Sequence, residues 1–372
     1  MTQRIYLDHN ATTTLHPSAQ AAAVKAMTAV GNASSIHTHG RVIRTMLEEA
    51  RVNVADFFAV KPSQIVFTSG ATEANNTIIK GFAGRLITSA IEHESVLEAN
   101  KSALRCRVEA QGVIDLTHLE NLLESSEGPT LVSIMAANNE TGVIQPLSDI
   151  VALSRQYGAK VHCDAVQILG KAAVDWASLN LDFISISGHK IGALQGIGAL
   201  IVNERIPVPP LMRGGGQERY YRSGTENSMG IVSFGAVIKA CKDLDWSNIK
   251  WLRDYLETQL IKLCPELVIF GNKADRLSNT CCFATPGIAS NTQVMYFDLM
   301  GISVSAGSAC SSGKVKVSHV LQAMDVAEPT LQQSLRVSLG QTTTEQEIHR
   351  FMEVWQQLYE RTQSNLKERI VS

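Results

Sequence analysis

The middle of the chain alternates short apolar segments with segments of helical character, and this alternation restricts the fold more than any other feature. Six segments have the length and content of strands: residues 64–70, 85–91, 130–138, 159–165, 181–189 and 196–203. Segments expected to be helical lie between or after them, at residues 72–80, 93–103, 146–157 and 227–244. Such alternation is typical of a mostly parallel sheet covered by helices. We therefore predict an α/β fold.

The pattern changes after a segment at residues 248–263 that is expected to be helical. The following apolar segments are predicted to be strands of a smaller α+β unit: ELVIFG (266–271), NTCCFATP (279–286), QVMYFDLMG (293–301), ISVSAG (302–307) and QSLRVSLG (333–340). A long helix is predicted at residues 344–365. We place the domain boundary near residue 255. The large domain would then be 15–255, and the small domain would be 1–14 together with 256–372.

The composition argues against several classes of protein. The chain has 372 residues and a formal net charge of −2, so it lacks the basic excess that engages nucleic acids or acidic membrane surfaces. The first residues, MTQRIYLDHNATTT, contain no apolar run typical of a signal peptide. The longest apolar stretch, around 184–202, contains His189 and Lys190, which argues against a membrane span. We expect a cytoplasmic protein that binds neither nucleic acid nor membrane directly.

The seven cysteines form no C-x-x-C pair, which argues against a disulfide framework and a structural zinc site, so no metal is expected. Cys163, Cys241, Cys281 and Cys282 lie in apolar segments and are predicted to belong to the core. Cys310 differs, because its surroundings, SAGSACSSG, are small and polar. Such a setting suits a reactive thiol on a mobile loop.

Polar residues directly after the predicted strands are candidates for a site, because ligands of α/β proteins bind beyond the carboxyl ends of the strands. The motif VFTSGATEANN runs from a strand into a helix through Gly70, Ala71 and Thr72. The free N–H groups of a helix N-terminus and the Thr72 hydroxyl would bind an anion. The alternative is an ordinary helix cap.

Two further strand ends carry ionisable residues. Asp164 follows an apolar strand, with Gln167 three residues later. It is either the partner of a buried cation or a helix cap. Lys190 ends an apolar, glycine-rich strand, flanked by Ser187 and His189. A lysine in such a place is a candidate Schiff-base amine, because burial lowers its pKa. The alternative is a lysine on a surface loop.

His93 ends another predicted strand, in the motif AIEHESV. Alone it would be structural, but near the other strand ends its ring could stack on a planar ligand. An anion site, a carboxylate facing a cationic nitrogen, a Schiff-base lysine and a stacking ring together match pyridoxal phosphate. Asn139, in the motif ANNETG, would then reach the phenolic oxygen of the ring.

The ordered motifs of this chain resemble the cysteine desulfurases of the NifS/IscS type, a part of the aminotransferase class V branch of the fold-type I pyridoxal phosphate enzymes. The resemblance covers nearly the whole chain and implies a seven-stranded, mostly parallel sheet in the large domain. The motifs are YLDHNATT, TSGATEANN, EHESV, NNETG, DAVQ, SGHK, RSGTEN, SAGSACSSG and LRVSLG.

The resemblance also implies roles for individual residues. The catalytic residues would be Cys310, Lys190 and His93. The cofactor contacts implied by the family are Lys190, Ala71, Thr72, His93, Asn139, Asp164, Gln167, Ser187, His189 and Thr225. Thr225 would reach the phosphate in the neighbouring subunit of a homodimer. The substrate carboxylate would be bound by Arg336, with Asn10 and Asn139 close to the substrate.

The expected activity is removal of sulfur from L-cysteine, leaving L-alanine and a persulfide on Cys310. An acceptor protein, such as an iron–sulfur cluster assembly scaffold, would then take the sulfur. A selenocysteine lyase or an aminotransferase of the same class remains an alternative within the enzymes, although transamination needs no cysteine on a loop. A non-catalytic iron–sulfur binding protein is disfavoured by the scattered cysteines, and a nicotinamide-dependent dehydrogenase by the lack of a G-x-G-x-x-G motif after a strand.

Overall fold

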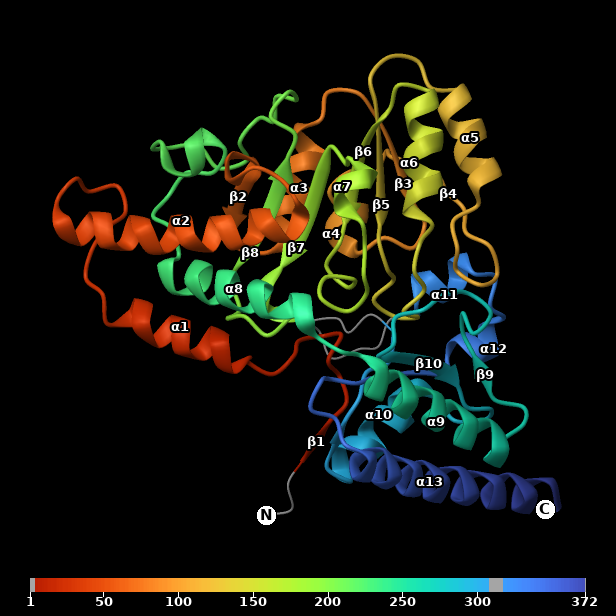
Figure 1. Ribbon diagram of the computed structural model, residues 1–372. Coiled ribbons are helices and arrows are strands. Elements are labelled where there is room, and N and C mark those ends of the chain that lie inside the picture. Colours follow the sequence, from red (N-terminus) through yellow and green to blue (C-terminus); the bar gives the residue numbers. More distant parts are fainter. Residues whose placement is uncertain (1–3, 308–316, 372) are drawn as a thin grey trace.

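The larger part of the molecule is built on a seven-stranded sheet, seen in a computed structural model that describes residues 4–307 and 317–371 (Figure 1). The strand order is β2-β8-β7-β6-β5-β3-β4, and only β8 runs against its neighbours. The strands are β2 (Ile65–Thr68), β3 (Arg85–Ser89), β4 (Leu104–Cys106), β5 (Thr130–Met135), β6 (Lys160–Asp164), β7 (Phe183–Ser187) and β8 (Gly198–Val202). The predicted α/β fold with a mixed, mostly parallel sheet is confirmed.

Helices cover both faces of this sheet, so its strands are apolar on both sides. Within β2, Ile65 and Phe67 belong to one core cluster and Val66 to another. The first cluster includes α2 (Thr38–Phe58), α5 (Leu116–Glu124), α6 (Leu147–Gln156), α7 (Trp176–Leu179) and α8 (Ser228–Ala240). The second includes α3 (Ala71–Gly81) and α4 (Glu94–Leu97).

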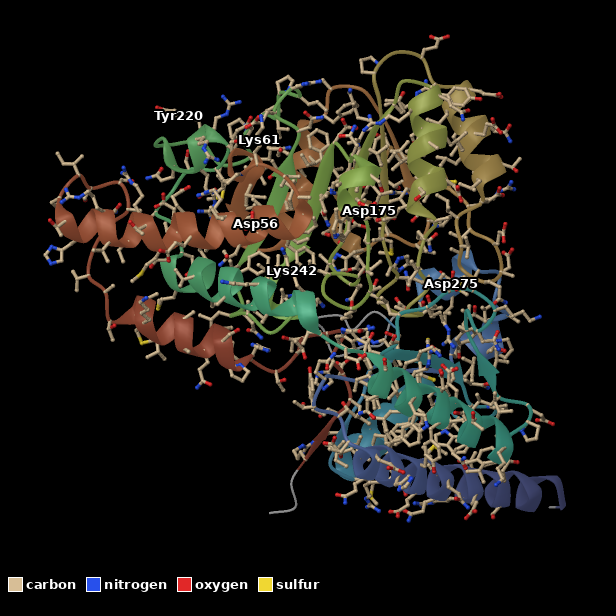
Figure 2. The ribbon with its side chains drawn as sticks, in the orientation of Figure 1. Asp56, Lys61, Asp175, Tyr220, Lys242 and Asp275 are labelled. Carbon is tan, nitrogen blue, oxygen red and sulfur yellow. The ribbon has the colours of Figure 1, made fainter. Side chains whose placement is uncertain are left out.

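Helix α1 (Pro17–Met27) lies beside α8, which also packs along α2 (Figure 1). Near the C-terminal ends of α2 and α8, the Lys242 ammonium donates a hydrogen bond to the Asp56 carbonyl at 3.1 Å. Figure 2 shows the two residues close together.

The smaller part has its own sheet and core, below the large sheet in Figure 1. Its antiparallel sheet has the order β12-β10-β9, with β9 (Val268–Ile269), β10 (Thr280–Ala284) and β12 (Ser334–Ser338). A short parallel pair joins β1 (Ile5–Tyr6) to β11 (Ile302–Ser303). The helices are α9 (Ser247–Leu263), α10 (Ser290–Leu299), α11 (His319–Ala323), α12 (Glu328–Leu331) and α13 (Glu345–Val371). No helix in the described stretches is long and apolar enough to cross a bilayer.

The two parts contact each other through the loop that follows β5. The Ile144 amide donates to the Asp275 carbonyl and the Leu277 amide donates to the Gly142 carbonyl, both at 2.8 Å. Asp275 lies at the junction of the two parts in Figure 2. This loop carries Asn139, so the small part is attached next to a predicted site residue.

The prediction of a strand over 293–301 is wrong, because residues 293–299 lie in α10. Gln293 and Phe297, four residues apart, are buried, while Met295 and Leu299 are exposed. This is the burial period of a helix on a surface. A short apolar run cannot be assigned by hydrophobicity alone. The helix predicted over 93–103 is also too long, since α4 ends at Leu97.

The domain boundary near residue 255 stays a prediction. That position lies inside α9, whose Ile249, Leu252 and Leu256 pack in the core of the small part together with Leu7. We propose that the small domain includes all of α9.

The cysteines predicted to lie in the core are buried, and so are Cys106 and Cys264.

Candidate active site

A cavity of about 660 Å³ lies where the carboxyl ends of the parallel strands face the small part. Its volume is in the range of small-molecule sites. Eleven of the thirteen predicted site residues line it: Asn10, Ala71, Thr72, His93, Asn139, Asp164, Gln167, Ser187, His189, Lys190 and Arg336. They come from seven stretches of the chain that are separated in the sequence, so the fold brings them to one place.

Of the other two predicted residues, Thr225 is not part of the cavity wall. Thr225 is exposed on the segment before α8. Cys310 lies outside the described residues. The residues near both ends of its segment, Gly307 and His319, line the cavity. Nearby, the Ser318 hydroxyl donates a hydrogen bond of 2.6 Å to Glu140.

The N-terminus of α3 forms an anion cradle at one end of the cavity. Gly70 precedes the helix with φ +154°, a conformation that essentially only glycine adopts, and no side chain caps the helix there. The sheet crowds this turn, since a Cβ on Gly198 would lie 2.7 Å from the Gly70 Cα atom. The free N–H groups at Ala71 and Thr72 therefore face the cavity without a competing side chain, which favours an anion.

Lys190 lies in the short 3₁₀ helix that follows β7. Its ammonium donates hydrogen bonds to the Asn10 carbonyl at 2.5 Å and to the Ala11 carbonyl at 2.8 Å. Burial and the positive charge of Arg336 lower the pKa of Lys190 to about 8. A sizeable fraction of this amine is thus unprotonated near neutral pH and can act as a nucleophile or a base.

A hydrogen-bonded chain that the sequence did not reveal links Asp164 to His93. The Asn75 side chain, on α3, donates to Asp164 Oδ2 at 2.7 Å and to Ser95 Oγ at 2.8 Å. The second carboxylate oxygen of Asp164 accepts the Val166 N–H at 3.0 Å. Asp164 is therefore held by neutral donors, which stabilise a carboxylate. Asn75 lies one helical turn after Thr72, and this spacing is the only feature of the sequence that indicates a place for Asn75 near the site.

The same chain orients His93. The Ser95 N–H donates to His93 Nδ1 at 3.0 Å, so this nitrogen must be an acceptor. In the neutral ring the proton is then on Nε2. Ser95 Oγ lies 2.8 Å from the same Nδ1 and fixes the ring further.

Arg336, on β12, lines the same cavity as Lys190. Its guanidinium donates to Asp8 Oδ1 at 2.7 Å and to the Asn139 carbonyl at 2.9 Å. Its Nε is buried without a hydrogen-bond partner. A buried donor of this kind favours an anionic ligand that completes its hydrogen bonds.

A second buried lysine, Lys171, is bound to two cavity residues. Its ammonium donates to Gln167 Oε1 at 2.9 Å and to Asn10 Oδ1 at 3.2 Å. Burial, followed by the charges of Lys190 and Arg336, lowers the pKa of Lys171 to about 7. The sequence did not predict Lys171 as a residue of the site, because a lysine seven residues after a strand does not by itself indicate a function.

The two lowered pKa values predict how the stability of the ligand-free protein depends on pH. Both amines lose their protons in the folded state near pH 7 to 8, whereas lysines of the unfolded chain keep theirs to about pH 10.4. Between these values the unfolded chain binds more protons, so the free energy of unfolding should rise with pH. Urea unfolding at pH 7 and pH 9 checks this. The free energy of unfolding should rise less between these pH values in Lys171→Met than in the wild type. An equal rise in both proteins would contradict a lowered pKa of Lys171.

The comparisons with known proteins agree with this geometry. Residues 5–351 match the family model described as aminotransferase class-V. The IscS-like cysteine desulfurase of Mycobacterium tuberculosis is 35% identical, with 94% of each chain covered. The cysteine desulfurase of Cereibacter sphaeroides is 37% identical, with 95% of each chain covered.

A solved structure with the same fold is that of a NifS-like protein from Rickettsia africae. It is 38% identical, with a TM-score of 0.91, and the match covers 96% of this chain and 100% of that chain. The resemblance of the motifs is confirmed by these matches along nearly the whole length. The chain is a member of the aminotransferase class V family, a family of pyridoxal phosphate enzymes.

Proposed function

We propose that this protein is a pyridoxal phosphate-dependent cysteine desulfurase that transfers sulfur from L-cysteine to Cys310. The observation that carries the proposal is a single cavity that joins Lys190, Asp164 and the anion cradle of α3 to Arg336 and to residues flanking the segment of Cys310. The names of several relatives at 35–38% identity support the same activity.

The donor set of the cavity fits pyridoxal phosphate. The phosphate would bind to the N–H groups of Ala71 and Thr72, with Ser187 and His189 beside them. Asp164 would hold the proton of the pyridine nitrogen, and the ring of His93 would lie against the pyridine ring. When bound, the cofactor supplies an aldehyde that takes up amines and a ring that accepts electrons from the substrate Cα. Gln167 and Asn139 would contact the phenolic oxygen.

Each side chain of the cavity would then have a separate role in the reaction. Arg336 binds the substrate carboxylate through its fork of donors, with Asn10 and Asn139 near the substrate. Lys190 Nζ moves the proton at the substrate Cα. The Cys310 thiolate attacks the sulfur of cysteine, an S–S bond forms, and the C–S bond breaks. The electron pair of that bond remains on carbon, which takes a proton to give alanine.

The other cysteines support the choice of Cys310 as the nucleophile. Burial raises the pKa values of Cys106 and Cys241 to about 12, and it also raises those of Cys163 and Cys281 well above the ordinary value of a thiol. These thiols stay protonated at neutral pH, and a thiol attacks as its thiolate. They are also enclosed by the core, where no acceptor could collect the sulfur.

Selenocysteine lyase is the second candidate, because the cavity described above would accept either amino acid. Selenium is a better leaving group than sulfur, so a lyase would depend less on Cys310. Turnover of cysteine and of selenocysteine, measured side by side, separates the two. Aminotransferase activity is disfavoured, since it has no use for a cysteine in a segment whose flanking residues, Gly307 and His319, line the cavity.

We also propose a homodimer in which Thr225 reaches the phosphate site of the second subunit. Several apolar side chains on α1, between α1 and α2, and in the segment before α8 are exposed in the single chain: Val24, Met27, Val30, Ile36, Leu211, Met212 and Tyr220. Figure 2 places Tyr220 at the outer edge of the molecule. Large apolar side chains that are exposed in the single chain are candidates for a protein interface. Sedimentation equilibrium tests this, and a monomer at micromolar concentration would contradict it.

The recipient of the sulfur is proposed to be a protein such as an iron–sulfur cluster scaffold. The name IscS, carried by two of the relatives, is consistent with this. The cytoplasmic location stays a prediction from the sequence.

The activity is tested with purified protein loaded with pyridoxal phosphate. Incubation with L-cysteine and a thiol reductant should release alanine and sulfide in equal amounts, and a persulfide should be found on Cys310 by mass spectrometry. Release of 3-mercaptopyruvate, the keto acid of cysteine itself, in place of alanine and sulfide would indicate transamination and overturn the proposal.

Replacing Arg336 by lysine should weaken the binding of cysteine. Lysine keeps a positive charge near Asp8 but loses the fork that binds a carboxylate at two points. The KM for cysteine should rise by roughly 10-fold or more, the loss expected for a charged hydrogen bond, with a smaller change in kcat. Arg276→Lys is the matched control, because Arg276 binds the Glu257 carboxylate away from the cavity. An unchanged KM in the Arg336 variant would contradict its role.

A further inference from the structure

We propose that Lys171 is a positioning residue that holds the side-chain amides of Gln167 and Asn10 in the orientation the reaction needs. This inference rests on the proposed function. Lys171 is 6% exposed and does not itself line the cavity, whereas both residues that accept its hydrogen bonds do. It therefore lies behind the cavity wall and acts through its partners.

The donors of Lys171 match the acceptors that surround it. Gln167 Oε1 lies 2.9 Å and Asn10 Oδ1 3.2 Å from the Lys171 nitrogen. A neutral amine still has two N–H bonds, one for each oxygen. The two hydrogen bonds therefore persist whether or not the amine is protonated.

Because Lys171 occupies the oxygen of the Gln167 amide, the NH₂ group is directed to the other side. There Gln167 Nε2 donates to the Asn10 carbonyl at 3.1 Å. The same carbonyl accepts the hydrogen bond from Lys190 at 2.5 Å. Lys171 thus orients a side chain that shares an acceptor with Lys190.

Lys171 acts on Asn10 in the same way. The Asn10 oxygen accepts from Lys171 and, at 3.0 Å, from Asn279. The Asn10 NH₂ group then donates to the Thr280 hydroxyl at 2.9 Å and to the Asn139 carbonyl at 3.2 Å. The Asn139 carbonyl in turn accepts from Arg336 at 2.9 Å. The network therefore extends from Lys171 to the arginine expected to bind the substrate.

Packing alone does not account for a lysine at this position. Among the described residues, no carboxylate lies within ion-pair distance of Lys171, and Lys190 and Arg336 add positive charge. A buried amine in such a place destabilises the fold relative to an apolar side chain of the same length. Its contribution is the pair of hydrogen bonds.

The test compares Lys171→Met, Lys171→Gln and the control Lys160→Met, at the opposite end of β6 from the cavity. The measurement is the Kd of pyridoxal phosphate, from titration of the ligand-free protein followed by absorbance. Circular dichroism checks that each variant folds. Lys171→Met should raise the Kd roughly 10-fold or more, because Gln167 Oε1 is left without a donor and Asn10 Oδ1 loses one of its two donors. Lys171→Gln, which keeps an NH₂ donor, should raise it less, and Lys160→Met should leave it unchanged.

A double-mutant cycle separates positioning from a general loss of stability. In a Gln167→Ala background, Lys171→Met should change the Kd by a smaller factor, since one of its two partners is already absent. The inference is overturned if Lys171→Met changes the Kd by the same factor in the wild-type and the Gln167→Ala proteins. It is also overturned if the Kd of Lys171→Met is within twofold of that of the wild type. If Lys171→Met does not fold, the same cycle with Lys171→Gln decides. Failure of the wild-type protein to bind pyridoxal phosphate would instead overturn the proposed function, and this inference with it.

Discussion

Lys190→Ala should lose both the covalent attachment of pyridoxal phosphate and the proton transfer at the substrate Cα. Lys190 is the amine at the carboxyl end of β7, and its pKa of about 8 leaves a reactive fraction at neutral pH. Loss of a positioned acid–base group alone slows a reaction by about 10²- to 10⁴-fold, so alanine release should fall at least that far. Treatment with borohydride, followed by peptide mass spectrometry, should find a pyridoxyl group on Lys190 of the wild-type protein and none in the variant.

Lys190→Arg is the matched control for charge. An arginine can still donate to the Asn10 and Ala11 carbonyls, which accept from Lys190 in the wild type. Its guanidinium stays protonated and cannot bond to an aldehyde. Both variants should therefore lose the label and the activity. A label on Lys171 of the wild-type protein would contradict the assignment, because it would make the second buried lysine the reactive one.

The fold could be predicted from the sequence where one physical pattern dominated. Each strand of the large sheet from β5 to β8 is an apolar run followed by polar or glycine-rich residues, and these runs are strands. The same reasoning failed for α10, since an apolar run of that length has no periodicity strong enough to exclude a helix. It also missed β4, whose three residues, Leu104–Cys106, are too few to form a pattern.

Most of the cavity wall was predicted in the same way, because the residues after parallel strands must meet at one edge. Asn10 and Arg336 were predicted only from the resemblance to the family. The residues behind the wall, Asn75 and Lys171, were not predicted. Asp164 and its partner Asn75 are 89 positions apart, and Lys171 and Asn10 are 161 apart. Local patterns cannot reveal hydrogen bonds that depend on the packing of distant segments. The role proposed for Thr225 would depend on a second subunit, which the sequence of one chain does not place.

The pKa values of the buried cysteines imply that their removal should matter little for the reaction. Cys106→Ala removes a buried thiol whose pKa is raised to about 12. We expect it to lower stability, since it leaves a small void in the core, and to keep the rate of alanine release close to that of wild type. It is therefore the matched control for the variant of Cys310.

Cys310→Ala should stop the reaction after the step that Lys190 performs. Without the thiolate the C–S bond has no attacking nucleophile, so alanine and sulfide release should fall by a factor on the order of 10³ or more. Binding of pyridoxal phosphate should persist, and so should exchange of the substrate α-proton with deuterium from the solvent, measured by NMR. Lys190→Ala should lose that exchange, so the two variants separate proton transfer from sulfur transfer. If Cys310→Ala releases alanine at the wild-type rate, Cys310 is not the nucleophile, and a selenocysteine lyase is favoured instead.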